Sequence, residues 1–321
     1  MTTVLVHRAG ATRVVEAVDP AWLAPDAPET VWVDVLAPTE SDRHLLHDVF
    51  HFHELALEDA LLEVQHPKIE TYDGFLYLIL HGIESAKRQK GIVTHDVDFF
   101  LGRNFLVSVH HAPSRSIQAE LEVCSRHEHI LAEGPGFLLH RIVDRMIDHY
   151  TPELDRLEER IEALEHLVFE RPQRNPLKEI LKLKGDIAAL RRVALPQRDA
   201  IARLARREFP QISEPLGYKF RDVYDHVVRL TDELVFMQDR VTGLLDAHLA
   251  NTSNRLNQVM KVLTVIATIF MPLTVVTGMY GMNVTLPHFP GGSGSQFWWV
   301  FGIMLAISGA MLWIFRRLEW L

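Results

Sequence analysis

Four aspartates recur at intervals of seven residues in the second half of the chain: Asp225, Asp232, Asp239 and Asp246. A period of seven keeps side chains on one face of a helix, so we expect these carboxylates to form an acidic stripe. Around a symmetry axis shared by several copies, each aspartate would become a ring of carboxylates that concentrates cations. An ordinary solvated acidic face is the alternative interpretation, and the period alone favours neither.

The same stripe continues toward the C-terminus without charge. Steps of three and four residues lead on to Asn257, Met260, Thr264, Ala267, Met271, Thr274 and Gly278. Polar and small side chains of this kind can line a narrow pore that holds no fixed charge. Small residues also mark positions where helices pack closely, and this second interpretation stays open.

The charged residues of the chain are distributed unevenly. Its 321 residues include 33 Lys and Arg and 42 Asp and Glu, yet none of these lies between Val262 and Phe315. Two apolar runs in that stretch, 262–282 and 297–315, approach the roughly 20 residues that span the hydrocarbon of a bilayer. A buried hairpin in a soluble protein is the alternative. Two adjacent uncharged runs favour membrane-spanning helices joined by an outer loop, 283–296.

Basic residues predict the orientation. Arg255 and Lys261 precede the first span, Arg316 and Arg317 follow the second, and the outer loop has neither Lys nor Arg. The positive-inside rule then predicts a multi-pass protein of the cell (inner) membrane with both termini in the cytoplasm. Two spans cannot enclose a water-filled path, so conduction would require an oligomer around an axis.

Two features of the remaining chain agree with a cytosolic location. We expect no signal peptide, because residues 1–15 lack a long apolar run. Cys124 is the only cysteine, which excludes an intrachain disulfide and fits a reducing compartment.

The part of the chain before the membrane is predicted to have two regions. Residues 1–112 form an α/β domain, with a helical pattern at about 37–62 and strand patterns at 3–6, 31–35, 69–80 and 96–109. Residues 113–255 carry Leu, Glu and Arg at helical spacing and form a stalk of long helices. Its last helix starts near Leu216 and continues into the first span, to about Gly278. A membrane domain, 256–321, follows the stalk.

A short motif lies at the outer end of the first span: Gly281, Met282 and Asn283. With the segments 259–264 and 267–274 before it, this motif resembles the pore helix and the Gly-Met-Asn signature of the CorA magnesium transporter family. The tripeptide alone would be weak evidence for this family. Its place after the first of two C-terminal spans makes the resemblance specific.

Upstream segments extend the resemblance. Phe220–His226 resembles the cytosolic part of the family's pore helix, and residues 58–60 and 66–70 resemble its N-terminal domain. The resemblance covers most of the chain and is densest from Phe220 to Asn283.

The resemblance implies a funnel-shaped homopentamer that conducts Mg2+, and also Co2+ and Ni2+, along its axis through the bilayer. Gly281, Met282 and Asn283 would form the selectivity filter. Asp222 matches a carboxylate that senses intracellular divalent cations between subunits, and Glu84 lies in the region expected to supply its partner. The positions that match the family's pore lining are Asn257, Met260, Leu263, Met271 and Thr274.

Some features leave zinc transport open. The outer loop has no acidic residue after Asn283, and His288 could supply a softer ligand. The zinc-transporting branch of the same superfamily, possibly coupled to protons, is therefore an alternative. His44, His47 and His51 would share one face if 37–62 is helical, a spacing that zinc ligands can use, although an exposed polar face explains them equally well.

Other classes of function have little support. The net charge of −9 argues against nucleic-acid binding, and no phosphate-binding loop supports ATP coupling or an organic cofactor. No nucleophile–base pattern indicates an enzyme. A membrane-tethered scaffold that conducts nothing is the remaining alternative.

Overall fold

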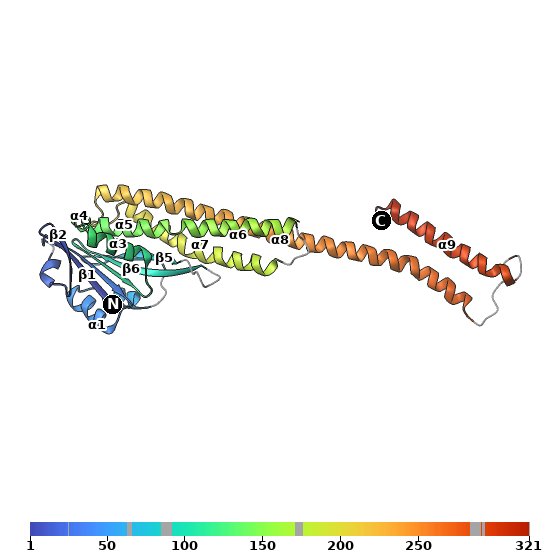
Figure 1. The fold of residues 1–321 in the computed structure, drawn as a ribbon, viewed down its shortest axis with the longest axis horizontal. Coiled ribbons are helices and arrows are strands. Elements are labelled where there is room, and N and C mark those ends of the chain that lie inside the picture. The colour runs from blue at the N-terminus through green and yellow to red at the C-terminus, as the bar shows by residue number, and fades with distance from the viewer. Residues whose placement is uncertain are drawn as a thin grey trace. The chain divides into compact units, whose positions relative to one another are not determined.

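A computed structural model of the chain defines residues 1–24, 26–62, 66–84, 92–170, 176–282, 290 and 293–320 (Figure 1). The chain forms two compact units, Met1–Leu245 and Asp246–Leu321. The three-part division expected from the sequence, with boundaries after residues 112 and 255, stays a prediction.

A seven-stranded sheet forms the centre of the first unit, in the order β2-β1-β3-β7-β6-β5-β4 (Figure 1). Neighbouring strands are antiparallel except for the central pair β3 and β7, which is parallel and places Val33 opposite Val107. The strands are β1 Thr2–Arg8, β2 Ala11–Val15, β3 Thr30–Leu36, β4 Lys68–Thr71, β5 Leu76–Glu84, β6 Val93–Leu101 and β7 Phe105–His110.

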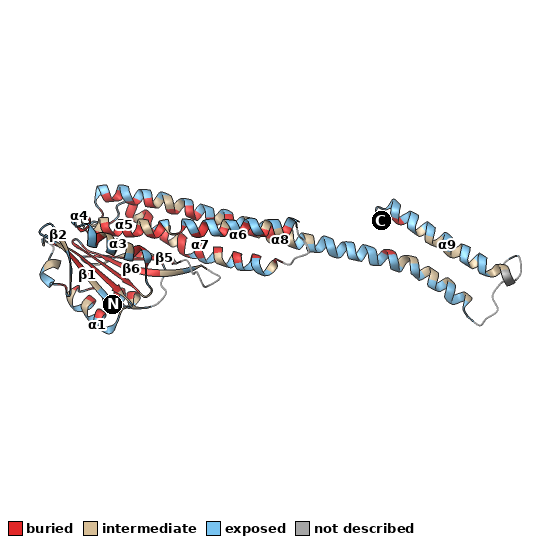
Figure 2. Cartoon of the chain, viewed as in Figure 1, coloured by how far each residue is buried: buried red, intermediate tan, exposed pale blue. Residues whose placement is uncertain are grey.

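Both faces of this sheet are covered, which explains why the central strands are buried (Figure 2). Helix α1 Glu40–His44 leads into the π-helical turn η2 Leu45–Val49. Side chains from η2 and from α2 Glu54–Leu61 belong to the core on one face, or lie beside it. The rings of Phe52 and Phe100 stack there with centroids 4.2 Å apart. Three later helices contact the sheet as well: α3 Arg115–Arg126, α5 Pro135–Asp148 and α7 Leu177–Ala205. A 3-10 turn, η1 Pro20–Leu23, joins β2 to β3.

The four strand patterns predicted from the sequence are confirmed, with turns at Gly74 and at 102–104 dividing the two longer ones. Strand β2 was not predicted, because its side chains are largely exposed and lack an apolar alternation. The helical pattern expected over 37–62 is confirmed in part, since α1, η2 and α2 lie within it but residues 50–53 are not helical. His51 adopts a positive φ of 55°, and the chain turns Phe50 and Phe52 into the core before α2 begins.

Helices make up the rest of the first unit. The pattern over 136–169 predicts one long helix, but the structure has two, because Tyr150 turns inward and its hydroxyl donates to the His81 carbonyl at 2.8 Å. The helices are α3 Arg115–Arg126, α4 His129–Ala132, α5 Pro135–Asp148, α6 Thr151–Glu170, α7 Leu177–Ala205 and α8 Glu214–Tyr280. The last is continuous over 67 residues, or roughly 100 Å at 1.5 Å per residue.

The second unit consists of the C-terminal part of α8 and of α9 Ser293–Arg317. Both helices are long and apolar enough to cross a membrane. Their large apolar side chains are exposed within the chain, with Met271 at 74% and Trp298 at 69%. A buried hairpin of a soluble protein would enclose such side chains, so this apolar surface fits a bilayer or a second copy of the chain.

Candidate functional site

The part of α8 in the first unit has a buried face and an exposed face. Its buried residues repeat every three or four positions: Val223, Val227, Leu230, Leu234, Met237, Val241 and Leu244. Asp225, Asp232 and Asp239 lie on the roughly opposite side and are exposed. Asp246, the first residue of the second unit, is exposed as well. Packing within the chain therefore leaves the predicted acidic stripe uncovered.

The side chains of these aspartates have no partner within the chain. No side-chain hydrogen bond or ion pair joins Asp225, Asp232, Asp239 or Asp246 to another residue within the described part of the chain, although Arg229 lies between the first two. Arg240, on the same helix, is instead bound to α6, where its guanidinium makes a 3.0 Å ion pair with Glu165. Arg240 thus stabilises the helix packing and does not pair with the stripe.

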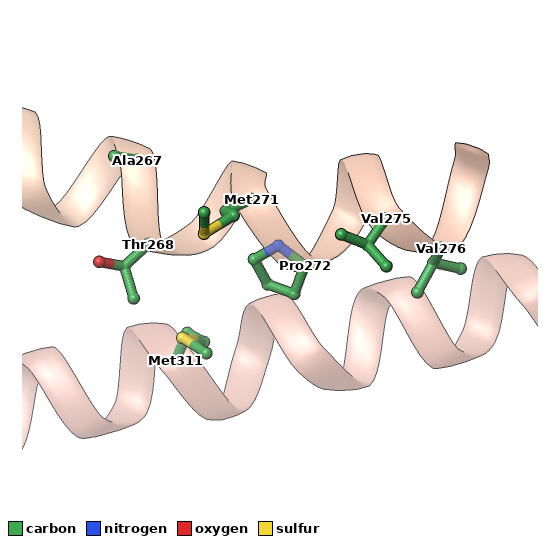
Figure 3. Close-up of a pocket in the computed structure, with 7 residues that line it drawn as sticks. All are labelled: Ala267, Thr268, Met271, Pro272, Val275, Val276 and Met311. Carbon is green, nitrogen blue, oxygen red and sulfur yellow. The ribbon is translucent and has the colours of Figure 1, made fainter. Parts of the chain in front are cut away.

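Helix α9 lies along one face of the apolar part of α8 (Figure 3). Among the described residues of the second unit, Val265 on α8 and Phe315 on α9 are the buried apolar ones. A pocket of about 640 Å³ between the two helices is lined by Thr268, Pro272, Val276 and Met311, among others (Figure 3). Thr268 and Pro272 point toward Met311 in this view, while Ala267 lies on the side of α8 away from α9 (Figure 3).

The predicted pore-lining residues follow one side of α8, and two of them, Ala267 and Met271, also line the pocket beside α9. All of them are exposed within the chain: Asn257, Met260, Leu263, Thr264, Ala267, Met271, Thr274 and Gly278. The hydroxyls of Thr264 and Thr274 each donate to a backbone carbonyl one turn earlier, at 2.8 Å. Their oxygens can still accept hydrogen bonds from water, so this uncovered stripe is weakly polar and uncharged.

The predicted filter follows directly on α8. Gly281 continues the helical hydrogen bonding, since its N–H donates to the Thr277 carbonyl at 2.8 Å, and Met282 is exposed. Asn283 lies outside the described residues, so its role stays a prediction.

The proposed regulatory carboxylates lie in the first unit. Asp222 is exposed on α8, one turn before His226. Glu84 is the last residue of β5 and pairs with Val93 of β6, but its side chain is not among the described ones. A contact between Asp222 and Glu84 is therefore still a prediction.

Sequence reasoning missed a mixed group of ligands beside Asp222. Asp144 and Asp148 on α5 and His226 on α8 each place a potential ligand atom within 4.8 Å of the others. The spacing of Asp144 and Asp148 by four residues predicts that they share a face of α5. Nothing in the sequence, however, indicates which helix lies against that face.

Burial and neighbouring charges shift the pKa values of two side chains where α5 lies against α8. The pKa of Asp144 is raised, mainly by burial and further by the carboxylates of Asp148 and Asp222. Burial lowers the pKa of His140, one turn earlier on α5, so this imidazole is neutral at pH 7. The ring of His140 packs against Phe220 of α8 with centroids 5.4 Å apart.

The histidines at the N-terminal end form no comparable group. His44 and His47 both contact the carboxylate of Asp48, with Nδ1–O distances of 3.5 and 2.7 Å. His51 follows η2 in a left-handed conformation. Among the described residues, only Asp144, Asp148 and His226 meet the geometry of a metal-holding group.

The comparisons with known proteins agree on one family. The sequence matches the family described as "CorA-like Mg2+ transporter protein" over residues 28–317. It is 30% identical over 303 residues to the cobalt/magnesium transport protein CorA of Thermotoga maritima, an alignment that covers 92% of this chain and 85% of the relative. It is also 28% identical over 187 residues to the zinc transport protein ZntB of Pectobacterium carotovorum, covering 58% of this chain and 56% of that one.

A solved structure confirms the predicted fold class. The complete structure of the CorA magnesium transporter from Methanocaldococcus jannaschii superimposes with a TM-score of 0.84 at 23% identity. The superposition covers 100% of this chain and 99% of that one, including the N-terminal α/β part, the long helix and the C-terminal helix. The chain belongs to the family of CorA-like Mg2+ transporter proteins, which transport divalent metal cations.

Proposed function

We propose that the chain mediates passive Mg2+ uptake, and passes Co2+ and Ni2+, through a pore on the axis of a homopentamer in the cell (inner) membrane. The main support is the uncovered stripe on α8, which carries Asn257, Thr264 and Thr274 but no charge. Because α9 lies along another face of α8, the stripe is free to face an axis in the assembly. Both termini lie in the cytoplasm in this arrangement.

A neutral filter suits Mg2+. This ion dehydrates reluctantly and keeps several waters when proteins bind it. A ring of Asn283 side chains, with backbone oxygens of Gly281 and Met282, would bind the hydrated ion through its water shell. The membrane potential can drive entry, since a divalent ion gains about 4.6 kcal/mol per 100 mV.

We expect the acidic stripe to act separately from the selectivity filter. Rings of Asp225, Asp232, Asp239 and Asp246 would attract cations to the cytosolic part of the pathway. Their lack of partners within the described chain favours this role, because neutralised carboxylates would attract cations weakly.

Gating is proposed to depend on intracellular Mg2+ at Asp222, with a carboxylate such as Glu84 of a neighbouring subunit as the partner. Bound Mg2+ would stabilise a closed, symmetric state, and Mg2+ depletion would release it. The exposure of Asp222 within the chain supports a contact between subunits.

Zn2+ transport, with or without proton coupling, is the second candidate. The relative named as a zinc transport protein and the outer loop without carboxylates favour it. The presence of Gly281, Met282 and Asn283 argues for Mg2+, since the resemblance to magnesium transporters rests on this motif.

The deciding experiment is a flux assay with the full chain in liposomes, comparing Mg2+, Co2+ and Zn2+ with and without a pH gradient. Mg2+ uptake should be abolished by Asn283→Ala with the oligomer intact. Gln258→Ala, an amide on α8 off the stripe, is the matched control and should keep it. Unchanged Mg2+ flux in Asn283→Ala would exclude the filter assignment. Flux of Zn2+ alone would favour the second candidate, and no flux of any ion would favour a scaffold.

A further inference from the structure

The pocket between α8 and α9 has an apolar wall with one polar position. Its volume is about 640 Å³, within the range of pockets that hold small organic molecules. Val275 and Val276 of α8 and Met311 of α9 supply much of the wall (Figure 3). Thr268 brings a hydroxyl and its backbone carbonyl to this lining.

The hydroxyl of Thr268 differs from those of neighbouring threonines on α8. Thr264 and Thr274 each donate to a backbone carbonyl one turn earlier, at 2.8 Å. No hydrogen bond joins the Thr268 hydroxyl to another residue that the structure describes. In Figure 3 this side chain points toward Met311 on the other side of the pocket. The pocket therefore contains a hydroxyl that can both donate to a ligand and accept from it.

Pro272 leaves a second polar group at the same place. Proline has no N–H, so the carbonyl of Thr268, four residues earlier, loses the donor that an α-helix normally supplies. Pro272 itself lines the pocket and points toward Met311 (Figure 3). A hydroxyl without a partner and a carbonyl without its helical donor are costly in an apolar, water-poor region. A ligand that bonds to both would relieve this cost.

The lining determines the chemistry of such a ligand. The apolar wall requires a hydrocarbon body, and Thr268 requires a head group that donates and accepts, as a hydroxyl does. A charged head group would lack an opposite charge, because no Lys, Arg, Asp or Glu lies between Val262 and Phe315. A lipid tail fits the wall but forms no hydrogen bond with Thr268, and a single water molecule leaves the apolar volume unfilled.

We propose that the pocket between α8 and α9 binds an uncharged amphiphile with a hydroxyl head group, of which a medium-chain alcohol is the simplest example. The head group bonds to Thr268, and the chain extends along α8 toward Val276, two turns or roughly 12 Å away.

The position of the pocket gives the ligand a place beside the predicted pore lining. Ala267 and Met271 belong to the predicted pore stripe and also line the pocket. The ligand therefore contacts the stretch of α8 that the proposed function places at the pore. Binding itself does not depend on that function, because both helices of the pocket belong to one unit of one chain.

The test uses the full-length protein in liposomes and a photoreactive 1-octanol with a diazirine on its chain. Mass spectrometry identifies the labelled residues. The alcohol should label the pocket of wild type, at Val275, Val276 or Met311, and excess 1-octanol should prevent this labelling. The same probe without its hydroxyl should label the pocket about two- to tenfold less, which is the range expected for one neutral hydrogen bond.

Two substitutions and a control locate the binding. Thr268→Val replaces the hydroxyl with a methyl group and should reduce labelling by the alcohol about two- to tenfold. Met311→Trp fills the pocket and should abolish the labelling that 1-octanol prevents. The matched control is Thr277→Val, because Thr277 is outside the pocket lining and its hydroxyl donates to the Thr274 carbonyl at 3.0 Å. This variant should be labelled as wild type is.

Three outcomes would overturn the site. The first is labelling that excess 1-octanol does not reduce, as expected if lipid tails or a helix of a second copy occupy the pocket. The second is equal labelling by the two probes, and the third is wild-type labelling of Thr268→Val or Met311→Trp. If Met311→Trp fails to fold, Thr268→Val decides the question.

Mg2+ flux is measured on the same protein preparations, so that the two proposals can fail separately. Absence of competed labelling in a wild type with normal flux contradicts this inference alone. Labelling of the pocket that depends on Thr268, in a protein without flux, contradicts the proposed function alone.

Discussion

The hydroxyl of Tyr77 on β5 donates a 2.5 Å hydrogen bond to Oδ1 of Asp98 on the neighbouring strand β6. Both side chains are fully buried, and Oδ2 of Asp98 has no hydrogen-bond partner. Burial raises the pKa of Asp98 well above its ordinary value of 3.8. The sheet therefore holds a carboxylic acid in its neutral form next to a phenol.

Replacing Asp98 with asparagine should change how stability depends on pH. The folded state keeps the proton on Asp98, whereas the unfolded chain releases it above about pH 3.8. This group's contribution to stability is therefore complete below that pH and is lost as pH rises toward the folded pKa. The loss approaches about 1.4 kcal/mol per pH unit. Asp98→Asn should remove this slope, keep the bond from Tyr77, and raise the unfolding temperature at pH 7.

Thermal unfolding of the detergent-solubilised protein from pH 5 to 8 checks this expectation. The control is Asp199→Asn, because the side chain of Asp199 is 72% exposed. Parallel pH curves for wild type and Asp98→Asn would contradict a buried neutral acid.

His110 should contribute a second pH dependence, at higher pH. Its Nε2 lies 3.1 Å from Oδ1 of Asp34 and its Nδ1 lies 2.6 Å from the Ala112 carbonyl, so both nitrogens face acceptors. Burial alone would lower the pKa of His110, but the hydrogen bond and charge of Asp34 raise it above 6.5. The stabilisation is therefore complete below pH 6.5 and is lost as pH rises through the folded pKa.

The variant His110→Gln tests this pair. It should be less stable than wild type at pH 6, by about 1–3 kcal/mol for a lost charged hydrogen bond, and the difference should shrink by pH 9. Chemical denaturation at several pH values measures it, with the exposed His129→Gln as the control. A deficit that stays constant with pH would show that His110 contributes only through packing.

The sequence predicts the membrane part of this chain better than the contacts between its helices. Length and lack of charge suffice to predict α9 and the apolar end of α8, because a bilayer imposes both properties on a spanning helix. The positions of Asp144, Asp148 and His226 depend instead on how α5 lies against α8. A single sequence does not show which turns of two helices are brought side by side. The inward turn at Tyr150 was missed for the same reason, since its partner His81 lies 69 residues earlier.

Arg240 should be important for the attachment of α8 to α6. Its guanidinium makes ion pairs with Glu158 and with both carboxylate oxygens of Glu165, and its side chain is only 21% exposed. Arg240→Ala leaves two carboxylates facing each other, so we expect a loss of about 1–3 kcal/mol in unfolding free energy. Arg240→Lys should recover only part of this lost unfolding free energy. The lysine restores a positive charge, but an ammonium cannot bind both carboxylate oxygens in the planar geometry of a guanidinium. Equal stability of Arg240→Ala and wild type in urea denaturation would contradict this assignment.

Asp222 should determine how the protein responds to intracellular Mg2+. If Mg2+ closes the pathway by binding this carboxylate, Asp222→Ala should require about tenfold more internal Mg2+ for inhibition of flux, a coupling change of roughly 1.4 kcal/mol. Mg2+ should also protect it less from limited proteolysis. Asp199→Asn, an exposed aspartate on α7, is the control. A wild-type response in Asp222→Ala would remove this residue from the sensor.

The acidic stripe should act over a distance, which distinguishes it from a binding site. Replacing Asp225, Asp232 and Asp239 together with asparagine removes three charges per chain from an exposed face without disturbing any contact in the described residues. Mg2+ flux at low ionic strength should fall severalfold, and the difference should nearly vanish near 1 M salt, where the Debye length is about 3 Å. The matched control neutralises exposed carboxylates of α6, Glu159 and Glu162, which do not lie on α8. An equal effect of this control would mean that only total charge matters. A loss of flux that salt does not relieve would mean that the aspartates bind the ion directly.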